Sequence, residues 1–219
     1  MKKSQVILIV FLVLLLDQIL KIYIKTTFPL HTAKPVFGSW FQLYFVENPG
    51  MAYGWKWGGN AGKIALTLFR LGAVSFGVYY LLKIIRERYH KGFVFCVSLI
   101  FAGAVGNLID SCFYGIIFDK GMVYNSLFNE YMGYQGIAVF SSTGYGAALQ
   151  GNVVDMLYFP LIKGNLPQWV PFWGGEYMEF FQPVFNLADA AISGGVIAII
   201  VFQKRFFKEK TTETEINPS

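Results

Sequence analysis

Four long apolar runs alternate with more polar stretches along this chain of 219 residues. Each run holds about the 20 mostly apolar residues that an α-helix needs to cross the hydrocarbon core of a bilayer. The pattern predicts an all-α membrane fold of four transmembrane helices, in a single domain over residues 1–204 with a polar tail at 205–219. The predicted helices cover residues 5–24, 61–84, 93–113 and 184–202.

Basic residues gather in the flanks of these runs and predict how the chain crosses the membrane. The N-terminus begins Met-Lys-Lys, the turn between the second and third runs reads KIIRERYHK, and the tail contains QKRFFKEK. Basic flanks favour the cytoplasmic side, so both termini are expected there. The outer segments 25–60 and 114–183 then face the opposite, outer side of the membrane. The net charge of +5 is interpreted as this topology signal and not as a nucleic-acid surface.

The two outer segments carry patterns of their own. The stretch FGSWFQLYFVENPG alternates in part and ends in turn residues, which predicts short strands and a small β-like cradle. The stretch MLYFPLIKGNLPQWVPFWGG is rich in aromatic residues, which favour the headgroup layer, so an interfacial segment is expected on the outer leaflet. Residues 119–151 are rich in Gly, Ser and Tyr and are predicted to be an inserted loop.

Acidic and amide side chains interrupt the apolar runs at a single depth. A charge at the centre of a spanning helix costs about 2.5–3.5 kcal/mol, so such residues mark a functional site by default. The third run ends, and the fourth begins, at the predicted outer face, and an Asn-x-x-Asp pair stands at each point. A third such pair lies in the outer segment before an apolar run. The polar residues at this level are Asp17, Lys21, Asn107, Asp110, Asn152, Asp155, Asn186 and Asp189.

These residues allow both structural and chemical interpretations. Asp17 and Lys21 stand four residues apart and suit an ion pair within one helix, and Asp110 suits a supporting hydrogen-bond role. No basic residue accompanies Asp189 inside its own run, which favours chemistry there. Two carboxylates in a partly dry site share a proton, so the site holds an acid and a base together. A pair of carboxylates at this depth therefore suits an aspartic hydrolase.

Other hydrolytic arrangements find little support in the sequence. There is no HExxH motif, and the two histidines, His31 and His90, are predicted on opposite sides of the membrane. No serine–histidine pair is expected at membrane depth. The two cysteines, Cys96 and Cys112, lie in one apolar run and suggest neither a disulfide framework nor a metal site. No metal ion is therefore expected.

Five short motifs occur in an order that resembles the lipoprotein signal peptidases, also called signal peptidase II. LLLDQILK, ENPGMAYGW, GAVGNLIDS, GNVVDMLYF and FNLADAAISGG follow one another from about residue 14 to residue 202. Five motifs in the family's order, with the matching topology, make the resemblance specific over nearly the whole chain. The positions that match the family are Asp17, Lys21, Asn48, Gly50, Ala52, Asn107, Asp110, Asp155, Asn186, Ala188 and Asp189.

The resemblance implies an aspartic endopeptidase of the inner membrane, with Asp155 and Asp189 as the catalytic pair. The other matching positions are then substrate-binding or supporting residues. The implied substrate is a prolipoprotein, cut just before its diacylglyceryl-modified cysteine at the outer-leaflet boundary. The resemblance also implies no cofactor, contact with membrane lipids, inhibition by globomycin-like cyclic peptides, and a monomer.

Departures from the family pattern bear on this site. Ser111 stands where the family often has arginine, and Arg70 in the second run has no assigned role. The gap between Asp110 and Asp155 is much longer than is usual for the family. Asp119 follows Asp110 at the shorter spacing and is the rival of Asp155. Local context favours Asp155, which follows Val-Val and precedes Met-Leu-Tyr-Phe, whereas Lys-Gly follows Asp119.

A proton-coupled transporter is the main alternative, because transporters also keep carboxylates inside membranes. Such a protein needs a polar route across the whole bilayer, whereas the inner halves of the first, third and fourth runs are almost wholly apolar. Inverted repeats are not evident in the sequence. A membrane scaffold is a further alternative, but it would not need both Asp155 and Asp189.

Overall fold

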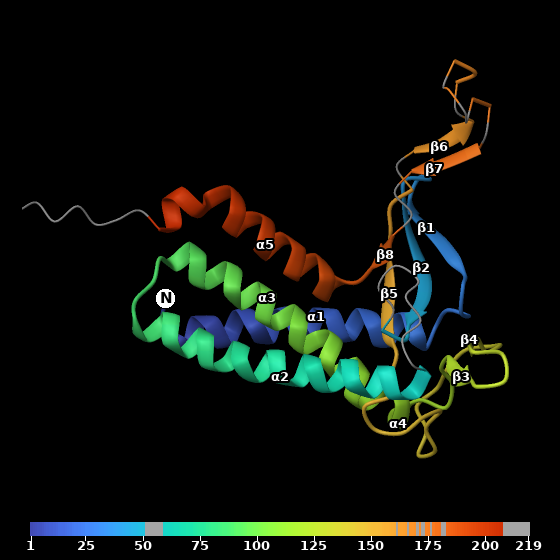
Figure 1. The fold of residues 1–219 in the computed structure, drawn as a ribbon, viewed down its shortest axis with the longest axis horizontal. Coiled ribbons are helices and arrows are strands. Elements are labelled where there is room, and N and C mark those ends of the chain that lie inside the picture. Colours follow the sequence, from blue (N-terminus) through green and yellow to red (C-terminus); the bar gives the residue numbers. More distant parts are fainter. Residues whose placement is uncertain are drawn as a thin grey trace, which may run out of the picture.

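The bundle of long helices dominates the computed structural model, which describes residues 1–50, 59–160 and 183–207 and the short stretches 162–165, 167–169, 171, 174–175 and 177–180. Among these residues, four helical segments are long and apolar enough to cross a membrane, as predicted. They run lengthwise along one another (Figure 1). The helices are α1 (Lys3–Lys25), α2 (Gly59–Arg86), α3 (Lys91–Ile109), which continues through the π-helical turn η1 (Asp110–Tyr114) into α4 (Gly115–Ile117), and α5 (Leu187–Phe206).

A small antiparallel sheet lies across one end of the helices, which is called the sheet end below (Figure 1). Its strand order is β1-β2-β5-β8. The opposite end, where α2 turns into α3, is called the loop end. Two separate hairpins, β3 with β4 and β6 with β7, extend from the sheet end. The strands are β1 (Ala33–Phe37), β2 (Phe41–Asn48), β3 (Val123–Asn125), β4 (Glu130–Met132), β5 (Val153–Tyr158), β6 (Ile162–Asn165), β7 (Tyr177–Phe180) and β8 (Val184–Phe185).

The helices expose apolar side chains and bury charged ones, which is the reverse of a soluble bundle. Along α1, Ile7 and Leu16 are more than half exposed, whereas Asp17 and Lys21 are fully buried. Ionisable residues inside spanning helices face the bundle interior in the same way. The distribution suits helices that are surrounded by lipid.

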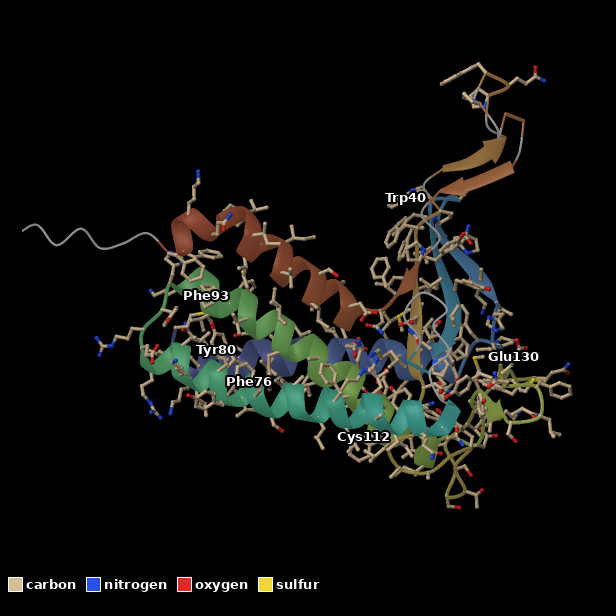
Figure 2. All side chains as sticks on the ribbon, in the orientation of Figure 1. Trp40, Phe76, Tyr80, Phe93, Cys112 and Glu130 are labelled. Carbon is tan, nitrogen blue, oxygen red and sulfur yellow. The ribbon has the colours of Figure 1, made fainter. Side chains whose placement is uncertain are left out.

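Two apolar clusters frame the buried polar layer. The first packs the sheet against the adjacent ends of α1 and η1, and the second joins the helices at the loop end, where Figure 2 shows Phe93. Apolar packing on both sides removes water from the polar layer and strengthens its electrostatic interactions. The clusters contain Ile24, Phe28, Phe45, Tyr114, Phe118, Ala138, Val154 and Met156 at the sheet end, and Val6, Leu81, Ile84, Phe93 and Val94 at the loop end.

Small residues bring α5 close to α3. A Cβ atom added at Gly103 would lie 2.2 Å from the carbonyl oxygen of Ala188, and one at Gly106 would lie 3.2 Å from the Ala188 side chain. Small residues at the contact of spanning helices allow this kind of backbone approach. The first turn of α5 therefore packs closely against α3 at Gly103 and Gly106.

The last helix begins later than predicted. Residues Val184 and Phe185 form β8, which pairs with Tyr158 and Leu157 of β5, and α5 begins at Leu187. Periodicity alone cannot separate two apolar strand residues from the helix that follows them. The helix also continues to Phe206, so the predicted tail begins inside it.

The insertion at 119–151 was predicted to be loop, yet it contains the β3–β4 hairpin. Several predictions fall on residues that the structure does not describe. Ala52, most of the tail and part of the predicted interfacial segment lie outside the described residues.

Candidate active site

Asp155 and Asp189 come from two neighbouring elements at the sheet end. Asp155 lies on β5, between β2 and β8, and β8 leads directly into α5 through Asn186. Asn186 is the N-cap of α5, where its Oδ1 accepts a hydrogen bond from the Asp189 N–H at 2.8 Å. The Asp189 Oδ2 accepts from the Asn186 N–H at 3.4 Å in return. This reciprocal pair is a capping box, and it orients the Asp189 carboxylate.

The side-chain amide of Asn186 links the Asp155 carboxylate to the backbone of Asp189. Its Nδ2 donates to Asp155 Oδ1 at 2.7 Å, while its Oδ1 holds the backbone of Asp189. Asn107 of α3 donates from Nδ2 to Asp189 Oδ1 at 2.8 Å, and its Oδ1 accepts from Asn186 at 3.1 Å. Two asparagines therefore fix the positions of both acids.

Burial gives Asp155 an unusual acidity. The residue is only 4% exposed, and burial, followed by the nearby charge of Asp189, raises the pKa of Asp155 from 3.8 to about 8. A carboxyl group with this pKa is mostly protonated at neutral pH. The site therefore holds a proton donor beside a second carboxylate, which is the arrangement of an acid–base pair.

Lys21 of α1 holds the supporting residues together. Its ammonium group lies 2.9 Å from Asp17 Oδ2 and 2.8 Å from Asp110 Oδ2, and it donates to Asn107 Oδ1 at 2.9 Å. The ion pairs are fully buried, and Gln18 reinforces them by donating to Asp110 Oδ1 at 2.9 Å. A buried cation of this kind is stable only when its neighbours satisfy it.

The two supporting aspartates each hold the residue before a candidate catalytic one. Asp17 Oδ1 accepts from the Ala188 N–H at 2.9 Å, directly before Asp189. Asp110 Oδ2 accepts from the Val154 N–H at 3.3 Å, directly before Asp155. The Lys21 cluster thus sets the backbone of both elements that carry the pair.

A cavity of about 470 Å³ opens beside Asp155. Asn48, at the end of β2, lines it, and its Oδ1 accepts from the Gly50 N–H at 2.8 Å. Residues of the insertion line the far wall, and Figure 2 shows Glu130 there at the sheet end. The complete lining is Val46, Glu47, Asn48, Pro49, Met122, Glu130, Tyr131, Asp155 and Val184.

A second buried polar cluster ties the insertion to the sheet and was not foreseen. Lys25 pairs with Glu47 of β2, and Glu47 Oε2 accepts from Asn152 at 2.6 Å and from the Met122 N–H at 2.8 Å. Lys63 of α2 donates to Asn152 Oδ1. The position of Lys25, one helical turn after Lys21, was a sequence signal that it also faces the bundle interior. The pairing of Asn152 with Glu47 had no such signal, because the two residues are more than a hundred positions apart.

The two rival positions have different surroundings. Asp119 lies in the insertion, where its Oδ1 accepts from the Val139 N–H at 2.7 Å and its own N–H donates to the Val139 carbonyl. These hydrogen bonds connect two parts of the insertion, at Asp119 and Val139, to each other. Asp155, in contrast, shares Asn186 with Asp189.

Arg70 reaches the site from α2. Its guanidinium donates to Ser111 Oγ at 2.7 Å. Arg70, which had no assigned role, therefore contacts the residue that departs from the family pattern. Ser111 in turn donates to the Asn107 carbonyl at 2.8 Å.

Comparisons with known proteins agree with this arrangement. The family model described as signal peptidase (SPase) II matches residues 9–205. The lipoprotein signal peptidase of Porphyromonas gingivalis is 46% identical over 200 residues, covering 90% of this chain and 81% of that protein. The lipoprotein signal peptidase of Amoebophilus asiaticus is 37% identical over 203 residues, covering 90% of this chain and 76% of that protein.

A solved structure of a bacterial membrane enzyme is similar in fold, with a TM-score of 0.56 and 24% sequence identity over 97% of this chain and 96% of that one. The family model and the two relatives confirm the resemblance found in the five motifs. They support a peptidase and not the alternative of a transporter. The chain therefore belongs to the signal peptidase II family, as a multi-pass membrane peptidase.

Proposed function

We propose that this chain is an aspartic endopeptidase that removes the signal peptide of prolipoproteins, with Asp155 and Asp189 as its catalytic pair. The observation that carries the proposal is the single amide of Asn186, which bonds to Asp155 and to the backbone of Asp189. Family membership supplies the reaction class, and this geometry supplies the two groups.

The two acids divide the work by their environments. Asp155, whose pKa is raised to about 8, is the proton donor, and Asp189 in its ionised form is the base. Asp189 takes a proton from a water molecule while the water oxygen attacks the scissile carbonyl carbon. Asp155 gives its proton to the carbonyl oxygen in the same step. Asp189 then passes its proton to the leaving amide nitrogen as the C–N bond breaks, and the new diol returns a proton to Asp155.

The substrate is a prolipoprotein that is cut before its diacylglyceryl-modified cysteine. Its signal peptide is itself a membrane helix, and the modified cysteine would reach the sheet end, where the pair lies beside the cavity lined by Asn48. Asn48, Gly50, Asn107, Asp110, Ala188, Asp17 and Lys21 are then substrate-binding or supporting residues. Globomycin-like cyclic peptides would bind at the same pair, and the chain would act as a monomer without a cofactor.

The sheet end is the periplasmic end in this proposal. The basic N-terminus and the basic α2–α3 turn both lie at the loop end (Figure 1), and basic flanks favour the cytoplasm. The active site then faces the periplasm, where a translocated lipoprotein chain emerges.

A gel-shift assay tests the proposal. Purified wild-type protein in detergent is incubated with a diacylglyceryl-modified prolipoprotein, alongside Asp155→Asn, Asp189→Asn and Asp119→Asn. We expect cleavage by the wild type and Asp119→Asn, and a loss of at least about a thousandfold in the other two, because each lacks one proton-transfer group. Full cleavage by Asp189→Asn would refute the assignment, and loss in Asp119→Asn with activity in Asp155→Asn would move the pair to Asp119.

A further inference from the structure

The buried face of α2 changes character along its length. Toward the sheet end it carries Lys63, Thr67 and Arg70, and toward the loop end it carries Leu81 and Ile84. The spacing of the three polar residues places them on one side of the helix. Each meets a polar partner, since Lys63 bonds to Asn152, Thr67 donates to the Leu149 carbonyl at 3.0 Å, and Arg70 donates to Ser111 at 2.7 Å.

Arg70 differs from the two lysines of α1 in its partner. Lys21 and Lys25 each form buried ion pairs with carboxylates. Within the described part of the chain, no carboxylate oxygen lies within 4 Å of the Arg70 guanidinium, and its hydrogen-bond partner is the neutral hydroxyl of Ser111. A charge kept in a spanning helix without a contact ion pair indicates a role in the site.

The charge of Arg70 nevertheless acts on the catalytic pair. It interacts at longer range with the carboxylates of Asp110, Asp189 and Asp155. Coulomb interactions of this length remain substantial where water is excluded. Lys21 already forms ion pairs with Asp17 and Asp110. Arg70 on α2 adds a second positive charge that acts on Asp155 and Asp189.

We propose that Arg70 is a positioning residue for the reaction, which rests on the proposed function of Asp155 and Asp189. Its charge, delivered from α2, favours the ionised form of one acid beside the protonated form of the other. Its bond to Ser111 also holds the turn of α3 that carries Asn107, because Ser111 donates to the Asn107 carbonyl. The guanidinium thus acts through the carboxylates and Asn107, and not on the substrate.

The charged surroundings of Asp155 come from several elements. Asp189 on α5, Asp110 on η1 and Lys21 on α1 act on it, and Arg70 acts from α2. Glu47 on β2 and Glu130 on β4 line the adjoining cavity. Removal of Arg70 leaves this set with one positive charge fewer, which disfavours negative charge at the site.

The pH dependence of cleavage tests the proposal. We expect Arg70→Gln to lower kcat about tenfold with a small change in KM, and to move both limbs of the pH–rate profile up by about one unit, since each limb reports an acid of the pair. Arg70→Lys keeps the charge and should leave the limbs in place. The matched control is Arg86→Gln, at the exposed loop end of the same helix, which should behave as the wild type.

A relocation variant separates charge from shape. In Arg70→Gln/Ser111→Arg the guanidinium returns from η1, one turn beyond Asn107, and we expect the limbs to return toward the wild-type pH. Thermal unfolding in detergent confirms that each variant is folded. The proposal is overturned if folded Arg70→Gln keeps the wild-type rate and profile, or loses rate equally at every pH, or if the folded double variant keeps the shifted limbs. Cleavage by Asp155→Asn or Asp189→Asn would instead refute the catalytic pair itself.

Discussion

At the scale of single residues, Asn186 has three tasks. It caps α5 by accepting from the backbone N–H of Asp189, it donates to Asp155, and it donates to Asn107. At Asn186 the capping box orients the carboxylate of the same Asn-x-x-Asp pair, Asp189. At the other two pairs the amides turn elsewhere, because Asn107 donates to Asp189 and Asn152 donates to Glu47.

Asn186→Ser separates capping from catalysis. Serine caps a helix about as well as asparagine does, but its short side chain carries one donor hydrogen in place of the two amide hydrogens that bond to Asp155 and Asn107. We expect the unfolding temperature in detergent to stay within a few degrees of the wild type, while cleavage falls about a hundredfold. Asn186→Ala serves as the comparison and should lose both helix stability and activity. Wild-type cleavage by Asn186→Ser would show that the amide is dispensable.

Asp155 should make the protein less stable as the pH rises. Its pKa is raised from 3.8 to about 8 in the folded state, so between these values the folded protein keeps a proton that the unfolded chain releases. Stability from this group is full below about pH 4 and is lost as the pH rises to about 8. Asparagine stays neutral, so Asp155→Asn should unfold about 2–4 °C higher than the wild type at pH 8. Thermal unfolding at pH 5 and pH 8 measures the effect, and an equal difference at both pH values would contradict it.

At the scale of elements, the apolar runs predicted the spanning helices well because lipid demands long uninterrupted helices. They did not predict β8, since Val184 and Phe185 are apolar in either structure and only their pairing with β5 makes them a strand. The β3–β4 hairpin was missed for the same reason, as strand pairing in a Gly- and Tyr-rich segment is weakly marked in sequence. Strand β2 of the cradle was predictable, because its residues alternate in part, whereas β1 lies almost wholly before the stretch that carried the prediction.

Gly103 on α3 controls how closely α5 approaches. A methyl group there would lie 2.2 Å from the Ala188 carbonyl, one residue before Asp189. Gly103→Ala should therefore displace the start of α5 and lower cleavage by about a hundredfold, since small shifts of a catalytic group are costly. Gly194→Ala is the matched control, because nothing lies within 4 Å of an added methyl group at Gly194. The prediction is contradicted if both variants cleave at the same rate.

At the scale of the whole molecule, the depth of the polar residues was the most informative property of the sequence. It placed residues from three helices at one level, and the structure joins them through Lys21, Asp17 and Asn107. Depth did not reveal which partner each residue takes. The links of Arg70 to Ser111 and of Asn152 to Glu47 connect distant parts of the chain and depend on helix rotation and strand register.

The orientation of the whole molecule can be read from cysteine labelling. In a Cys96→Ala/Cys112→Ala background, single cysteines are placed at Glu87, in the exposed turn at the loop end, and at Ser126, in the exposed β3–β4 turn. A membrane-impermeant maleimide applied to cells with a permeabilised outer membrane should label Ser126→Cys, and label Glu87→Cys only after the inner membrane is opened. The opposite order would place the active site in the cytoplasm.

The ion pair inside α1 bears on how the chain enters the membrane during synthesis. Asp17 and Lys21 lie one turn apart and contact at 2.9 Å, so α1 carries its own counter-charge before any other helix exists. The α3 segment brings Asp110 without a cation near it on the same helix, and its partner is Lys21 of α1. An unpaired carboxylate in lipid is costly, so we expect α3 to enter the bilayer favourably only beside α1. The first helix would then act as the template on which the third assembles.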